Sequence, residues 1–123
     1  MGQKPNKTLQ DSKLKVLRPT LRERKRFIRV KIQSTKKFTF KELSENLTEE
    51  IILYIGSIDF GKAGVWFLRD KFNEKEQELI VKVGVKFKDK LVGVLSLINK
   101  IGNTQVKLKT IRISGTLKGV MKE

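Results

Sequence analysis

The residues of this sequence that are best suited to a chemical role are cations, and many of them lie in or beside one strand-like pattern. The run from residue 18 to residue 32, RPTLRERKRFIRVKI, passes directly from a cluster of like charges into a strict alternation of apolar and other side chains. Arginine and lysine arranged in this way are suited to contacts with a phosphate backbone. The candidates for phosphate contact are Arg22, Arg24, Lys25, Arg26, Arg29, Lys31, Lys82, Lys86, Arg112 and Lys118.

Most catalytic chemistry is excluded by composition. The chain has no Cys and no His, which removes thiol nucleophiles, Cys/His zinc sites and imidazole acid–base catalysis. The sequence also lacks a catalytic triad, a phosphate-cradling glycine loop and any metal-ligand spacing. We therefore predict no catalytic residue, no metal site and no cofactor bound by the protein itself.

The charge of the chain predicts a polyanionic partner. The formal net charge is +15 on 123 residues, a self-repulsion that a bound polyanion relieves. Residues 1–37 hold 13 basic and 2 acidic residues, residues 38–80 hold 5 and 9, and residues 81–123 hold 10 and 2. The longest apolar run, residues 91–98, is far shorter than the roughly 20 residues of a membrane span, so we expect a cytoplasmic protein without membrane contact.

The periodicity along the chain predicts one α+β domain over residues 19–118. Residues 1–18 are expected to form a basic, flexible tail and residues 119–123 a short C-terminal tail. Strands are predicted at 27–33, 65–72, 78–87 and 104–115, helices at 39–55 and 88–101, and a glycine loop at 56–64. Thr39 and Glu42 have the spacing of a capping box, and a change of parity near Lys109 or Thr110 predicts a bulge in the last strand. The order βαββαβ predicts a ferredoxin-like, RRM-like sandwich, with a four-stranded antiparallel sheet and two helices on one face.

The open face of such a sheet carries cations in place of the usual aromatic platform. RNA-binding domains of this architecture stack bases on aromatic residues of the third strand. Here that strand reads LIVKVGVKF, with Lys82 and Lys86 facing away from the core. A phosphate backbone is therefore a better ligand for this strand than single bases, although a merely solvated basic face is the alternative for any one lysine.

The second predicted helix is apolar almost all round, so its own sheet cannot cover it completely. Leu95 and Ile98 can face the sheet together with Leu91, but Val92, Val94 and Leu97 cannot all do so as well. Either a partner protein or residues 1–20 of the chain cover the rest. The candidates for a protein interface are Leu91, Val92, Val94, Leu97 and Trp66, with core packing as the alternative for Trp66.

Four stretches of the sequence resemble the protein component 2 family of archaeal ribonuclease P, which is related to a small subunit of the eukaryotic enzyme. They are PTLRERKRFIRVKI, KAGVWFLRDKF, LVGVLSLINKIG and RISGTLKGV, which together span residues 19–120. One departure concerns the third strand, where many relatives have Gly-Ile-Ile-Arg and this chain has Lys82 at the arginine position. Lysine lacks the planar fork of arginine, so a bidentate phosphate contact is not carried over to this strand.

The resemblance implies a non-catalytic, RNA-binding subunit of a ribonucleoprotein that removes the 5′ leader from precursor tRNA. It implies that the RNA holds the magnesium-dependent catalytic centre, and that the protein supports the catalytic domain of that RNA. It also implies a second protein subunit of the component 3 type as a partner. We further expect self-association through the glycine loop at residues 56–64.

Two other functions remain as alternatives. A ferredoxin-like phosphatase of the acylphosphatase kind needs an arginine in a glycine-rich loop after the first strand. This chain has STKKFTF there, without arginine or glycine, which counts against this enzyme. A protein-binding or ligand-sensing module with incidental charge predicts weak RNA affinity that is indifferent to RNA structure.

Overall fold

The structure of the protein is a computed structural model that describes residues 24–122. The tail predicted for residues 1–18, and Arg22, lie outside these residues. The elements are, in chain order, β1 (Lys25–Gln33), α1 (Phe40–Ile55), α2 (Ser57–Ala63), β2 (Trp66–Phe67), the 3₁₀ turn η2 (Arg69–Lys71), β3 (Glu78–Gly84), the 3₁₀ turn η3 (Val85–Phe87), α3 (Lys88–Leu97), β4 (Lys100–Ile101), β5 (Thr104–Gln105), β6 (Lys107–Ser114) and α4 (Leu117–Val120).

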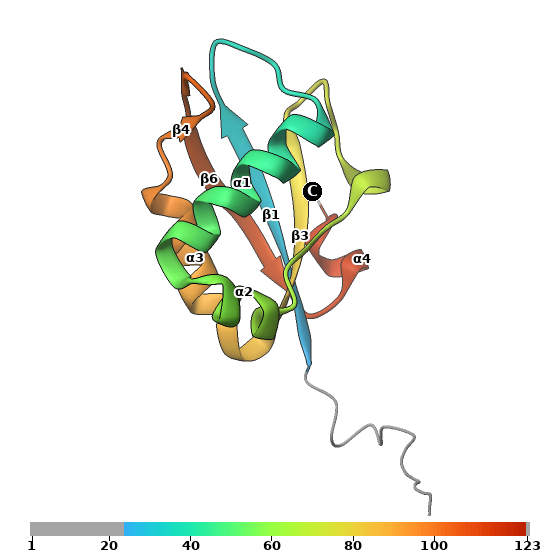
Figure 1. Cartoon of the computed structure of the whole chain (residues 1–123). Coiled ribbons are helices and arrows are strands. Elements are labelled where there is room, and N and C mark those ends of the chain that lie inside the picture. Colours follow the sequence, from blue (N-terminus) through green and yellow to red (C-terminus); the bar gives the residue numbers. More distant parts are fainter. Residues whose placement is uncertain (1–23, 123) are drawn as a thin grey trace, which may run out of the picture.

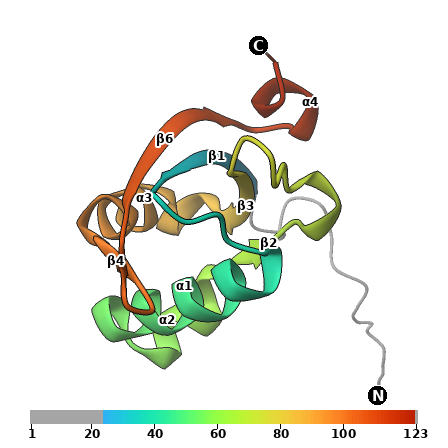
Figure 2. The same ribbon diagram turned by 90° about the horizontal axis from the view of Figure 1, so that it is seen from above.

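The predicted sandwich is confirmed. Its four antiparallel strands lie in the order β2-β3-β1-β6, with α1, α2 and α3 on one side of the sheet (Figures 1 and 2). Alternate residues of β1 point into the core, where Ile28 is fully buried, and they meet the apolar stripe of α1 that contains Leu47. The helices and the sheet thus enclose one main core. This agrees with the sequence, in which apolar residues recur with the 3.6-residue period of a helix and the 2-residue period of a strand.

The predicted bulge in the last strand is also present. Val30 of β1 pairs with Thr110, whereas Arg29 pairs with Arg112, so that Ile111 is the extra residue on β6. This position is within two residues of the predicted one. Because the bulge resets the alternation, Leu108 and Ile113 can both lie on the helix side of the sheet.

The bounds of three predicted strands are corrected. The strand predicted at 65–72 consists of β2 and the turn η2, the strand predicted at 78–87 ends at Gly84 and is followed by η3, and residues 104 and 105 form β5 in a separate hairpin.

Two further segments differ in kind. The glycine loop at residues 56–64 contains the helix α2, which begins after Gly56 (φ 85°) and ends at the left-handed Gly64 (φ 64°). The second predicted helix stops at Leu97, and the chain continues into a small hairpin of β4 and β5 whose turn contains Gly102 (φ 62°). Gly102 therefore serves a β-turn in the structure and does not end the helix.

The last helix covers part of the other side of the sheet (Figure 2). Helix α4 contacts β1 and β6, and Thr116 caps it by accepting a hydrogen bond from the Gly119 N–H (3.0 Å). Val120 of α4 and Ile80 of β3 are buried, at 0% and 2% exposure, although neither belongs to the main core. The domain boundary predicted at residue 118 falls inside α4, so residues 119 and 120 belong to the folded unit.

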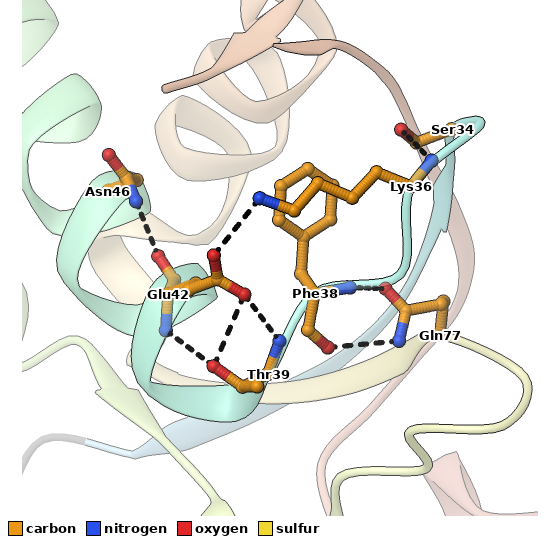
Figure 3. Close-up of polar contacts among 7 residues, drawn as sticks. All are labelled: Ser34, Lys36, Phe38, Thr39, Glu42, Asn46 and Gln77. Atoms are coloured by element: carbon orange, nitrogen blue, oxygen red, sulfur yellow. Dashed lines mark hydrogen bonds and ion pairs between the residues drawn. The ribbon is translucent and has the colours of Figure 1, made fainter. Parts of the chain in front are cut away.

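The predicted capping box at the start of α1 is present (Figure 3). The Glu42 N–H donates to Thr39 Oγ1 (3.2 Å), and the Thr39 N–H donates to Glu42 Oε1 (3.0 Å). Lys36 Nζ lies 3.2 Å from the other carboxylate oxygen. The backbone hydrogen bond from Thr39, assisted by Lys36, holds the pKa of Glu42 below its ordinary value of about 4.5.

This pKa shift predicts a pH dependence of stability. Because the folded pKa of Glu42 is lowered, its contribution is complete above about pH 4.5 and is lost as the pH falls below that value. The difference in free energy of unfolding between the natural chain and Glu42→Gln is expected to stay constant above this pH and to shrink below it. Urea unfolding at a series of pH values measures the difference.

Glu45→Gln is the matched control, since no hydrogen bond joins the Glu45 side chain to another residue in 24–122. A difference that stays constant into acid would contradict the prediction.

Candidate nucleic-acid interface

Four of the predicted cations lie at one end of the sheet, which we call the cationic end: Arg24, Lys25, Lys82 and Lys86. The register of β1 and β3 brings them there. Lys25 pairs with Gly84 and Phe27 pairs with Lys82, while the Val85 N–H donates to the Arg24 carbonyl (2.8 Å) and so places η3 beside the start of β1. Among residues 24–122, none of the four forms an ion pair with a carboxylate. Arg24, Lys25 and Lys86 are exposed and Lys82 is half-buried.

Two predicted cations in the middle of the sheet are held by carboxylates of the chain. Arg29 donates twice to Glu78 Oε1, at 2.6 and 2.9 Å, and its Nη1 donates to the Lys122 carbonyl (3.1 Å). The Arg29 side chain is only 14% exposed. Lys31 Nζ lies 3.7 Å from Glu76 Oε1 and donates to the Glu76 carbonyl (2.9 Å). Because these groups are already hydrogen-bonded and Arg29 is nearly buried, we do not retain the two residues in the predicted phosphate-contacting set.

The remaining described candidates are Arg26, Arg112 and Lys118. Arg26 lies in β1 at the same end of the sheet, between Lys25 and Phe27, but it is half-buried, and its Nη1 donates to the Lys25 carbonyl (3.0 Å). Arg112 of β6 is exposed and pairs with Arg29, and Lys118 is exposed on α4. The structure thus divides the predicted surface into the cationic end, a neutralised centre and scattered cations on the β6 side.

The predicted protein interface is only partly available at the surface. Leu91 and Val94 are 2% and 6% exposed and belong to the core cluster, so a partner cannot reach them and their assignment to an interface is corrected. Val92 is half-buried, whereas Leu97 is 59% exposed and Trp66 is 64% exposed. Helix α3 can bury more of its apolar residues than a single sheet-facing stripe because α1 packs against it as well.

Further exposed apolar side chains, which the sequence analysis did not identify, lie where α1 meets α2. Leu53 and Ile58 are 77% and 75% exposed, and Tyr54 between them is 49% exposed. Beside this region, a groove of about 270 Å³ runs between α1 and β2 and is lined by Phe40, Phe60 and Phe67 among others. The sequence contains a signal for the exposure of Leu53. Leu53 lies six positions after the core residue Leu47, and six positions along a helix do not return to the same face, so the two side chains cannot both point into the core.

Two features are absent from the part of the chain that the structure describes. Within residues 24–122, His, Cys, Asp and Glu side chains nowhere form a group of three or more that could hold a metal ion. No helix in this range is long and apolar enough to cross a membrane.

A ferredoxin-like sheet with clustered cations at one end, none of which forms an ion pair within residues 24–122, defines a small α+β protein with a strongly basic surface. Comparison with known proteins identifies the family. The model of the Rpp14/Pop5 family matches residues 16–123, and the chain belongs to this family.

Curated relatives agree with this assignment, and a solved structure shares the fold. The chain is 34% identical to ribonuclease P protein component 2 of Thermococcus gammatolerans, over 86% of this chain and 87% of that protein. It is 33% identical to the protein of the same name from Archaeoglobus fulgidus, over 85% and 92% of the two chains. A chain in the cryo-EM structure of yeast ribonuclease MRP has the same fold, with a TM-score of 0.60 and 10% identity over 77% of this chain and 76% of that one.

Proposed function

We propose that this chain is a non-catalytic protein subunit of ribonuclease P, the ribonucleoprotein that removes the 5′ leader from precursor tRNA. The proposal is carried by the cationic end of the sheet, considered together with membership of a family whose archaeal members are named ribonuclease P protein component 2. RNA segments that pack closely repel one another through their phosphates. Cations fixed on a folded sheet neutralise that repulsion at one place, without the entropy that a mobile arm would lose.

The proposed division of labour leaves the chemistry to the RNA. In this proposal the RNA subunit holds the magnesium ions of the catalytic centre, and this chain binds and supports the catalytic domain of that RNA. The composition of the chain agrees with such a role, because it has no Cys and no His with which to carry out general acid–base or thiol chemistry.

We further propose a second ribonuclease P protein, of the component 3 type, as a direct partner. The helix layer offers exposed apolar surface for this contact at Leu97 on α3 and at the α1–α2 junction around Leu53 and Ile58. Self-association through residues 56–64 is proposed for the same junction, where Ile58 of α2 is the exposed anchor. Either contact would remove a large aliphatic side chain from water.

Reconstitution of precursor-tRNA cleavage tests the proposed function. Ribonuclease P RNA and the component 3 type protein are assayed with and without this chain over a range of magnesium concentrations. We expect the chain to raise the cleavage rate and to lower the magnesium requirement, because bound cations replace part of the ionic screening. An unrelated protein of similar size and net charge is the control. Equal effects of the two proteins, or no effect of this chain, would favour the alternative of a module with incidental charge.

A further inference from the structure

Two aromatic side chains and one lysine lie in a row across the outer face of the sheet, the face opposite α1 and α3. Trp66 of β2 pairs with Lys82 of β3, and Lys82 pairs with Phe27 of β1. Residues that pair directly across strands share a face of the sheet. The neighbours of Trp66 agree with this direction, because Val65 and Phe67 pack against the main core whereas Trp66 does not. Since β2 is the edge strand, Trp66 also lines one side of the groove beside α1. We call Trp66, Lys82 and Phe27 the aromatic row.

The aromatic row lies beside the part of the sheet that α4 covers. The next row toward α4 contains Ile80 and Arg29, which are buried or nearly so. In the aromatic row, by contrast, Trp66 is 64% exposed and Phe27 and Lys82 are half-buried. An indole left this open to water on a folded sheet favours a ligand with an apolar, flat surface.

The surroundings of the aromatic row favour a polyanion as that ligand. Lys82 lies between the two aromatic residues, and the following row begins with Lys25 and Gly84. Lys25 Nζ lies 3.1 Å from the position that a Cβ on Gly64, two residues before β2, would occupy. Neither of these two rows contains an acidic residue on β1, β2 or β3. An apolar protein surface would leave both ammonium groups without partners, whereas RNA supplies flat bases together with phosphates.

We propose that the aromatic row is a stacking site for unpaired RNA bases, an inference that rests on the proposed function and adds a single-stranded segment to it. One base stacks on the Trp66 indole and another on the Phe27 ring. Strands spaced by about 4.8 Å place these two residues about 10 Å apart, which leaves room for the connecting phosphates over Lys82 and Lys25. Stacking of this kind tolerates any base, because each base has a π-face.

Trp66 is the only tryptophan of the chain, so its fluorescence reports on the proposed site directly. The full 123-residue chain is titrated with an oligouridylate and an oligoadenylate of about ten nucleotides, and with a G·C-rich RNA hairpin duplex of about ten base pairs. Moderate salt, about 0.3 M, weakens the purely ionic binding and leaves stacking in place. We expect saturable quenching by each single strand. The duplex should quench little, because its bases are already stacked.

Variants separate stacking from charge, with affinity measured by the anisotropy of a dye-labelled single strand. Trp66→Ala is expected to weaken single-strand binding by roughly 5- to 140-fold, the loss of one base–aromatic stack. Trp66→Phe should retain most of the affinity. Phe27→Leu keeps an apolar side chain in a partly buried place and should also weaken binding. Tyr54→Ala removes an exposed aromatic ring of α1 and is the matched control, which should bind as the natural chain does.

The outcomes distinguish this inference from the proposed function. If single strands do not quench Trp66, or if Trp66→Ala binds them unchanged, the stacking site is wrong. The same holds if Trp66→Ala impairs pairing with the second protein and leaves oligonucleotide binding intact. In each of these cases the proposed function stands, provided that the chain still stimulates cleavage in the reconstitution. Failure of that stimulation, with quenching observed, would overturn the proposed function and leave a general single-strand site.

Discussion

Replacing all four residues of the cationic end by glutamine is expected to lower the slope of log affinity for ribonuclease P RNA against log salt by about 3. Each phosphate that a cation neutralises contributes roughly 0.7 to 0.9 to this slope through the release of counterions. Between about 50 and 200 mM salt, the four residues should therefore account for roughly a 50- to 150-fold change in affinity. Filter binding or anisotropy over a salt series measures the slope for the natural chain and the variant.

The matched control removes the same charge from the opposite end of the sheet. Four exposed lysines near the β1–α1 loop and the β2–β3 connection are replaced by glutamine: Lys37, Lys41, Lys71 and Lys75. Both variants lower the formal net charge by four, from +15 to +11. We expect the control to keep a slope close to that of the natural chain. Equal losses in the two variants would show that overall charge, and not the cationic end, attracts the RNA.

The parts of the fold that could be predicted are those in which a period of the sequence matches a period of the backbone. Residues of β1 alternate because one face is buried, and Leu43, Leu47 and Ile51 recur along α1 because they share one face of that helix. The α2 helix was missed because its seven residues are too few for a periodic pattern, and glycines lie before, within and after it. Helix α4 is shorter still, with Val120 as its one buried residue. No local pattern identifies an element whose formation depends on a distant sheet.

The candidate site could be predicted in its residue types but not in which of them remain available. Arg29 and Lys82 look equivalent in the sequence, since each is a cation on the outer face of a strand. The register decides between them: it brings Glu78, 49 positions away in the chain, next to Arg29. The aromatic row was missed for the same reason. Its rings come from β1 and β2, so a motif sought on the third strand alone does not contain them.

Replacing Gln77 by alanine is expected to lower the free energy of unfolding by about 2–6 kcal/mol. Gln77 is buried, and its side chain joins the β2–β3 connection to the loop before α1 (Figure 3). Its Oε1 accepts from the Phe38 N–H (2.8 Å), and its Nε2 donates to the Phe38 carbonyl (3.1 Å) and to the Glu74 carbonyl (2.7 Å). Alanine leaves both main-chain groups of Phe38 buried without partners, each at a cost of about 1–3 kcal/mol. Urea unfolding followed by circular dichroism measures the change.

The backbone at Gln77 allows the contribution of its side chain to be separated from backbone strain. Its φ of 55° lies in the left-handed region, which costs a non-glycine residue about 1–2 kcal/mol. Gln77→Gly removes the same hydrogen bonds but relieves this strain, so it should destabilise the protein by about 1 kcal/mol less than Gln77→Ala. Gln105→Ala, an exposed glutamine on β5, is the control and should change stability by less than about 0.5 kcal/mol. If Gln77→Ala unfolds at the same urea concentration as this control, the hydrogen bonds of the Gln77 side chain contribute no net stability. The β2–β3 connection and the loop before α1 would then be held in place by the core and by backbone hydrogen bonds alone.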